Sequence, residues 1–186
     1  MRKIFVLFFI SACFFASAQS KYSQIDKSPL DIVYYPPNYP VLKVQDKVTE
    51  PLIARVLYSR PQKSGRIIFG DLISYGKVWR LGANEATETE FYQPIIINNV
   101  KIKKGRYTLY GIPLESKWTI ILNRENDSWG SFKYDEKKDV VRIDIPTEKI
   151  SEPNESFSML FTKVDKFNIT LAISWDSVQV NLPIQL

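Results

Sequence analysis

Residues 157–182, FSMLFTKVDKFNITLAISWDSVQVNL, contain three of the short runs of apolar, β-branched and aromatic residues that recur along this chain. Successive side chains of a strand point to opposite faces of a sheet. Two sets of apolar residues therefore each share a face: Phe157, Met159 and Phe161, and Val178, Val180 and Leu182. The pattern predicts strands over 157–162, 168–175 and 178–182, each with one face in the core.

The same alternation continues upstream of residue 157. Further strands are predicted over 41–44, 52–58, 88–92, 95–97, 100–102, 107–112, 118–123 and 140–145. Asn98-Asn99 predicts a tight hairpin turn, because asparagine tolerates the positive φ that such turns need. Helix is expected only as short pieces near 69–75 or 146–150. The predicted fold class is all-β, an antiparallel two-sheet β-sandwich that is jelly-roll-like and has little helix.

Residues 1–18 have the pattern of a secretory signal peptide. A basic start at Arg2 and Lys3 precedes an apolar run, and Ala16-Ser17-Ala18 ends it with small residues. The apolar run is shorter than the roughly 20 residues that cross a membrane. We therefore expect an exported protein, periplasmic or secreted, with no transmembrane segment after signal removal. An alternative reading of 10–13 as a lipobox would make Cys13 a lipid anchor.

The segment 19–40 is rich in proline and tyrosine and predicts an extended arm, because its prolines oppose both helix and central strand. Its tyrosines favour an arm that lies along a groove or a sheet edge. No internal repeat or second boundary follows. The remainder, 41–186, is predicted to be a single β-sandwich domain.

Composition excludes several kinds of chemistry. The chain has no histidine, and its one cysteine, Cys13, lies in the signal. A Ser-His-Asp triad, a cysteine nucleophile, a His/Cys metal site and a disulfide framework are therefore unavailable. Without Arg2 and Lys3, 23 basic residues face 20 acidic ones, a net charge of +3. This mild, dispersed charge favours no nucleic-acid partner.

Four sequence blocks, YSRP at 58–61, GRIIFG at 65–70, YGKVWR at 75–80 and GANEAT at 82–87, resemble the family known as domain of unknown function 2911. The resemblance continues through Gly105-Arg106-Tyr107, Trp118, Trp129-Gly130 and Tyr134-Asp135. It implies a protein secreted by, or attached to the envelope of, a Gram-negative bacterium. It implies no activity, substrate or catalytic residue.

The most unusual stretch, 58–87, gathers arginines, aromatics and an Asn-Glu pair and indicates a contact surface. Aromatic faces stack on sugar rings, and planar polar groups bind hydroxyls at the rim. The candidate ligand-binding residues are Tyr58, Arg60, Arg66, Tyr75, Trp79, Arg80, Asn84, Glu85 and Trp129. The expected ligand is a polysaccharide, a peptide or an envelope protein, bound without catalysis.

Three other interpretations of this stretch stay open. The aromatics could fill the core while Arg80 and Glu85 form an ion pair. The protein could be a structural component of the envelope. Glu85 could also work with Asp71, Glu88 or Glu90 as the carboxylate pair of a glycoside hydrolase. The loop 126–128 has too few acids for calcium, so neither metal nor cofactor is expected. The oligomeric state is not predicted.

Overall fold

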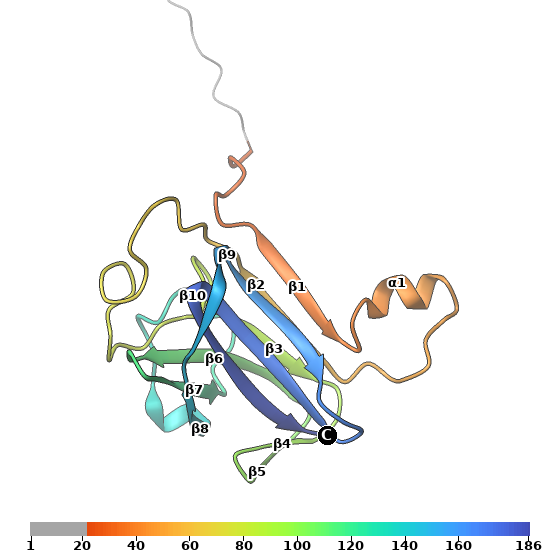
Figure 1. Ribbon diagram of the computed structural model, residues 1–186. Helices are drawn as coiled ribbons and strands as arrows, with labels where there is room; N and C mark the ends of the chain where they lie inside the picture. Colours follow the sequence, from red (N-terminus) through yellow and green to blue (C-terminus); the bar gives the residue numbers. More distant parts are fainter. Residues whose placement is uncertain (1–21) are drawn as a thin grey trace, which may run out of the picture.

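The structure, a computed structural model, describes residues 22–186 (Figure 1). The predicted signal peptide and Cys13 lie outside the described residues. Within them, ten strands dominate and helix is confined to two short pieces, α1 and the 3-10 helix η1. The elements are β1 (Leu30–Tyr35), α1 (Tyr39–Val44), β2 (Ala54–Ser59), β3 (Glu88–Phe91), β4 (Ile95–Ile97), β5 (Val100–Ile102), β6 (Gly105–Pro113), β7 (Lys117–Asn123), η1 (Glu136–Lys138), β8 (Asp139–Pro146), β9 (Glu148–Lys163) and β10 (Asn168–Gln185).

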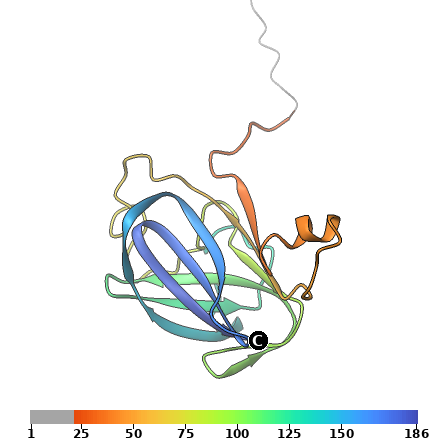
Figure 2. The same cartoon turned by 45° about the vertical axis from the view of Figure 1, so that its right-hand side comes forward.

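The strands form two antiparallel sheets that pack face to face (Figures 1 and 2). One has six strands in the order β1-β2-β3-β6-β7-β8, and the other has four in the order β5-β4-β10-β9. The chain passes from the first sheet to the second between β3 and β4, returns between β5 and β6, and crosses again between β8 and β9. The last crossing is at Thr147, whose backbone N–H donates to Ser116 O at 3.0 Å. The predicted all-β sandwich is therefore confirmed.

An aromatic cluster fills the space between the sheets. Trp79 stacks on Trp175 of β10, with ring centroids 6.1 Å apart, and meets Trp118 of β7 edge-on at 5.8 Å. Phe157 of β9 packs against both Trp79 and Trp175. The faces predicted from alternation lie in this core: Phe157, Met159, Phe161, Val180 and Leu182 are buried, and Val178 is partly buried against it. Burial of such large rings supplies the main stabilisation of a fold without disulfides.

The predicted hairpin turn is confirmed, and one strand is longer than predicted. Asn98 and Asn99 have φ of 49° and 61° and join β4 to β5. The runs predicted as separate strands at 168–175 and 178–182 form the single strand β10. Asp176, with φ of 53°, marks the irregularity where the pairing with β9 shifts register. A β-bulge interrupts the alternation of side chains without ending the strand. The sequence therefore predicts two strands where the structure has one.

Three predictions of local structure are wrong. Residues 41–44 belong to the helix α1, which starts with Pro40 in its first turn and has no buried residue. The run predicts a strand as readily as a helix, because its valines and leucine suit either element. Residues 146–150 form no helix, since they end β8 and begin β9. Residues 69–75 are turns held by a bridge between Phe69 and Ile73.

The arm predicted over 19–40 contributes a strand to the six-stranded sheet. Its residues Leu30–Tyr35 form β1, which pairs with β2 along its whole length and lies at the sheet edge. Tyr35 is the buried residue of β1, and its ring meets Phe161 at 6.0 Å. The helix α1 projects from the sandwich after β1 (Figure 2). Between residues 22 and 186, no helix has the length and apolar character needed to span a bilayer.

Candidate functional site

Two loops meet on the outer face of the six-stranded sheet, the face turned away from the core. One is 80–87, which leads into β3, and the other is 124–135, which follows β7. Glu85 and Trp129 form an antiparallel bridge, flanked by hydrogen bonds from Ala86 N to Ser128 O at 2.8 Å and from Gly130 N to Asn84 O at 2.9 Å. The first loop is itself closed by Thr87 N, which donates to Arg80 O at 3.0 Å.

A second, smaller apolar cluster anchors these loops. Tyr110 of β6 and Ile121 of β7 are opposite each other in the sheet and bury their side chains with Ala86, apart from the main core. Their strand neighbours Leu109 and Ile120 point into the main core, so alternation places the small cluster on the outer face. Tyr134 packs edge-on against Tyr110, with centroids 5.2 Å apart. The 124–135 loop is therefore anchored to the sheet through Tyr134, near its C-terminal end.

Trp129 is the exposed aromatic of this fixed loop. Its relative exposure is 62%, whereas Trp79, Trp118 and Trp175 are each 4% exposed or less. The backbone around it is specified by positive φ angles of 57° at Asn84 and 65° at Gly130, which asparagine and glycine adopt at low cost. The indole is thus held out into solvent by an ordered backbone.

Two hollows flank the segment 127–129. The first hollow, of about 340 Å³, is lined by Leu30, Leu57, Tyr58, Glu85, Ala86, Glu88, Asp127, Ser128 and Trp129. The second hollow, of about 470 Å³, is lined by Tyr110, Glu125, Asn126, Asp127, Ser128, Trp129, Phe132, Lys133 and Lys138. Trp129 is thus the ridge between a hollow lined by three acids and one lined by acids and lysines.

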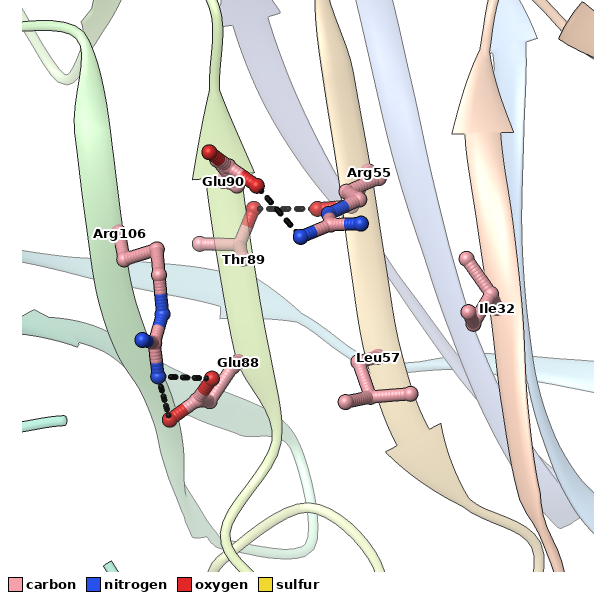
Figure 3. Close-up of a pocket in the computed structure, with 7 residues that line it drawn as sticks. All are labelled: Ile32, Arg55, Leu57, Glu88, Thr89, Glu90 and Arg106. Carbon is pink, nitrogen blue, oxygen red and sulfur yellow. Dashed lines mark hydrogen bonds and ion pairs between the residues drawn. The ribbon is translucent and has the colours of Figure 1, made fainter. Parts of the chain in front are cut away.

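Arginine-carboxylate pairs continue the first hollow across the sheet (Figure 3). Arg106 of β6 donates to Glu88 of β3 at 2.8 Å and to Asp127 at 2.7 Å. Hydrogen bonds to Asp127 and Glu88 raise the pKa of Arg106. Glu90 forms a second ion pair with Arg55 of β2, whose Nη2 lies 2.8 Å from Glu90 Oε2. A small pocket of about 80 Å³ lies among these side chains and shares Leu57 and Glu88 with the first hollow.

The structure brings three of the nine predicted binding residues to the first hollow, namely Tyr58, Glu85 and Trp129. Tyr58 is buried and presents little surface there, while its hydroxyl accepts from Met159 N at 3.1 Å. Asn84 does not line the hollow, although it precedes Glu85 and its carbonyl accepts from Gly130 N. Trp79 lies in the core, with its indole N–H donating to Gly82 O at 3.2 Å.

The remaining predicted residues lie elsewhere. Arg60 bridges β1 to β9 through Asp31 at 3.0 Å and Ser158 at 2.9 Å. Arg66 donates to the carbonyls of its own loop, at Gln62 and Lys63. Tyr75 is partly exposed beside Gly70.

Arg80 and Glu85 form no ion pair within residues 22–186. Arg80 is half-buried, its Nε has no hydrogen-bond partner there, and burial lowers its pKa. It is also absent from the linings of the two hollows. The guanidinium of Arg80 therefore neither holds the carboxylate of Glu85 in place nor contributes to the lining of the first hollow.

Sequence reasoning missed Asp127, Ser128, Phe132 and Lys133 as lining residues. The signal was present in the loop cluster Asn126-Asp127-Ser128 directly before Trp129. Asparagine, aspartate and serine in a loop suggest a calcium site as readily as a ligand hollow, and no group of acids in 22–186 is arranged to hold a metal. Spacing along the chain could not show that this loop pairs with residue 85, some 40 positions upstream.

Comparison with known families adds one finding. A family model described as "Protein of unknown function (DUF2911)" matches residues 40–184. The chain belongs to the DUF2911 family. The resemblance inferred from the sequence blocks is thereby confirmed. The DUF2911 match contains both loops of the site and begins after β1. Searches of curated proteins and of solved structures gave no match.

Proposed function

We propose that this DUF2911 protein is an exported, non-catalytic carbohydrate-binding module whose ligand stacks on Trp129. The observation that carries the proposal is an indole 62% exposed on a backbone fixed by hydrogen bonds on both sides. A large apolar side chain held in water is a feature of interaction sites. An ordered platform also loses little conformational entropy when a ligand binds.

The groups around the indole suit a sugar. The ring offers an apolar face to the C–H face of a pyranose. Glu85, Ser128 and Asp127 in the first hollow, and Asn126 and Lys133 in the second, offer acceptors and donors for hydroxyl groups. The hollows lie on both sides of Trp129, so a chain of several sugars would cross the ridge.

The carboxylates favour binding over hydrolysis. Both oxygens of Glu88 accept from Arg106, at 3.0 and 2.8 Å, and one also accepts from Asp127 N at 2.8 Å. Glu90 is held by Arg55 and Tyr92. Glycoside hydrolysis needs two carboxyl groups free to act across the bond. Of the acids considered as catalytic pairs, Glu85 alone is both in the first hollow and free of an arginine.

A binding assay with a matched control tests this proposal. Trp129→Ala should weaken binding of any glycan identified on an oligosaccharide array by at least about tenfold, because the stacking face is lost. Phe167→Ala removes an aromatic of similar exposure, 57%, at the distant β9–β10 turn and should bind as the wild type does. Affinities would be measured by calorimetry on proteins of unchanged melting temperature. Glycan binding that survives Trp129→Ala would contradict the proposal.

A further inference from the structure

Glu85 and Trp129 are direct partners in an antiparallel bridge. Opposite residues of an antiparallel pair project their side chains to the same face, with Cβ atoms roughly 4.5–5.5 Å apart. Both residues also line the first hollow. The backbone therefore places a carboxylate beside an exposed indole, and does so through main-chain hydrogen bonds rather than through loop contacts that could rearrange.

Glu85 is the acid of the first hollow whose charge is uncompensated. Glu88 and Asp127 share Arg106 as their ion-pair partner. The exposed carboxylate of Glu85 has no hydrogen-bond or ion-pair partner within the described part of the chain, and no lysine or arginine lines the first hollow. This local excess of negative charge contrasts with the chain as a whole, whose net charge is +5.

An indole face and a free carboxylate together select a cation. The ring attracts a positive charge through its quadrupole, and the carboxylate pairs with it. A sugar that carries only hydroxyl groups would use the ring and leave the charge of Glu85 unused. We propose that the first hollow binds a sugar bearing a protonated amine, an inference that rests on the proposed carbohydrate binding at Trp129.

The second hollow makes this preference directional. Lys133 and Lys138 line it, and Lys138 pairs with Glu125. Glu125 and Asp127 also line it, but Asp127 pairs with Arg106, so Lys133 is the charge of this hollow that has no ion-pair partner within residues 22–186. A cationic group on that side of Trp129 would face this lysine, and the repulsion of like charges costs free energy. The amine-bearing unit is therefore assigned to the side of Glu85.

Two oligosaccharides that differ only in acylation provide the test: a tetramer of β-1,4-linked glucosamine and the same tetramer with every amine N-acetylated. The wild type should bind the amine tetramer several-fold more tightly in low salt. Raising the ionic strength from about 0.05 to 0.5 M should remove most of that preference through screening. Glu85→Gln, which keeps the side chain's shape without its charge, should bring the ratio of the two affinities from roughly fivefold to near one.

Glu152→Gln is the matched control, because Glu152 is an exposed acid of β9 that lines neither hollow. It makes the same change in net charge and should leave the ratio unchanged. Equal binding of the two tetramers by the wild type would overturn the amine inference and leave carbohydrate binding standing. A preference lost equally in Glu152→Gln would also overturn it, as a general charge effect. Failure of both tetramers and of the whole glycan array would overturn both proposals.

Discussion

Asp139 shows how one side chain supports the loop that carries Trp129. Its carboxylate accepts hydrogen bonds from Tyr134 Oη at 2.6 Å, Arg142 Nε at 2.6 Å and Asn123 Nδ2 at 2.7 Å. Its side chain is only 10% exposed. Burial, and then the hydrogen bond to Asp139, raise the pKa of Tyr134. Because Tyr134 also packs on Tyr110, Asp139 connects β8 to the small apolar cluster beneath the 124–135 loop.

Replacing Asp139 should therefore destabilise the protein more than replacing an exposed acid of the same strand. Asp139→Ala leaves three donors without their acceptor and should lower the free energy of unfolding by about 2 kcal/mol. Asp144→Ala removes a carboxylate that is 52% exposed and should cost no more than about 0.5 kcal/mol. Urea unfolding followed by fluorescence measures both. Equal losses would show that the Asp139 network contributes no more than a surface pair.

At the scale of the element, the turn between β9 and β10 depends on one carboxylate. Asp165 Oδ1 accepts from Phe167 N at 2.7 Å and from Asn168 N at 2.9 Å. Hydrogen bonds from Asn168 and Phe167 lower the pKa of Asp165 below its ordinary 3.8. Since the folded state prefers the charged form, this group stabilises the fold above that value, and the stabilisation is lost as pH falls through the lowered pKa.

The variant Asp165→Asn should accordingly differ from the wild type in a pH-dependent way. At pH 7 its melting temperature should be lower, because the amide is a weaker acceptor than the carboxylate for the two backbone N–H groups. The difference should begin to shrink as the pH falls below 3.8 and should be lost below the lowered pKa, where the folded wild-type carboxylate also becomes neutral. Thermal melts at several pH values check this. A difference that stays constant down to pH 2 would argue against a charged acceptor in this turn.

The sequence predicted the parts of the fold that local sequence features determine alone. Alternating apolar residues identify the buried face at Phe157, Met159 and Phe161, and Asn98-Asn99 identifies a hairpin, because both are local properties. The bulge at Asp176 depends on the pairing of β10 with β9, and the residues of α1, which starts at Tyr39, suit a strand as well as a helix, so alternation predicted both incorrectly. The site was predicted in part for the same reason. Trp129 and Glu85 stood out by type, but their pairing is a long-range contact.

At the scale of the whole molecule, stability and the candidate site occupy opposite faces of one sheet. Trp79 and Trp118 lie against the inner face of the six-stranded sheet, where they meet Trp175 of the other sheet. Trp129 lies on the outer face. Changes at the site should therefore alter binding without loosening the contact between sheets, and core changes should do the reverse.

Fluorescence quenching tests that separation directly, because the chain has four tryptophans and only Trp129 is exposed. A charged quencher such as iodide does not enter an apolar core, so in the native protein it should quench one class of tryptophan emission. Trp129→Phe should remove this class of emission. Its free energy of unfolding in urea should change by no more than about 0.5 kcal/mol, since no core contact is lost. The matched core variant Trp175→Phe should keep the quenchable class and lose stability instead. Iodide quenching that persists in Trp129→Phe would mean that solvent enters between the sheets, and the division between a closed core and the exposed Trp129 would fail with it.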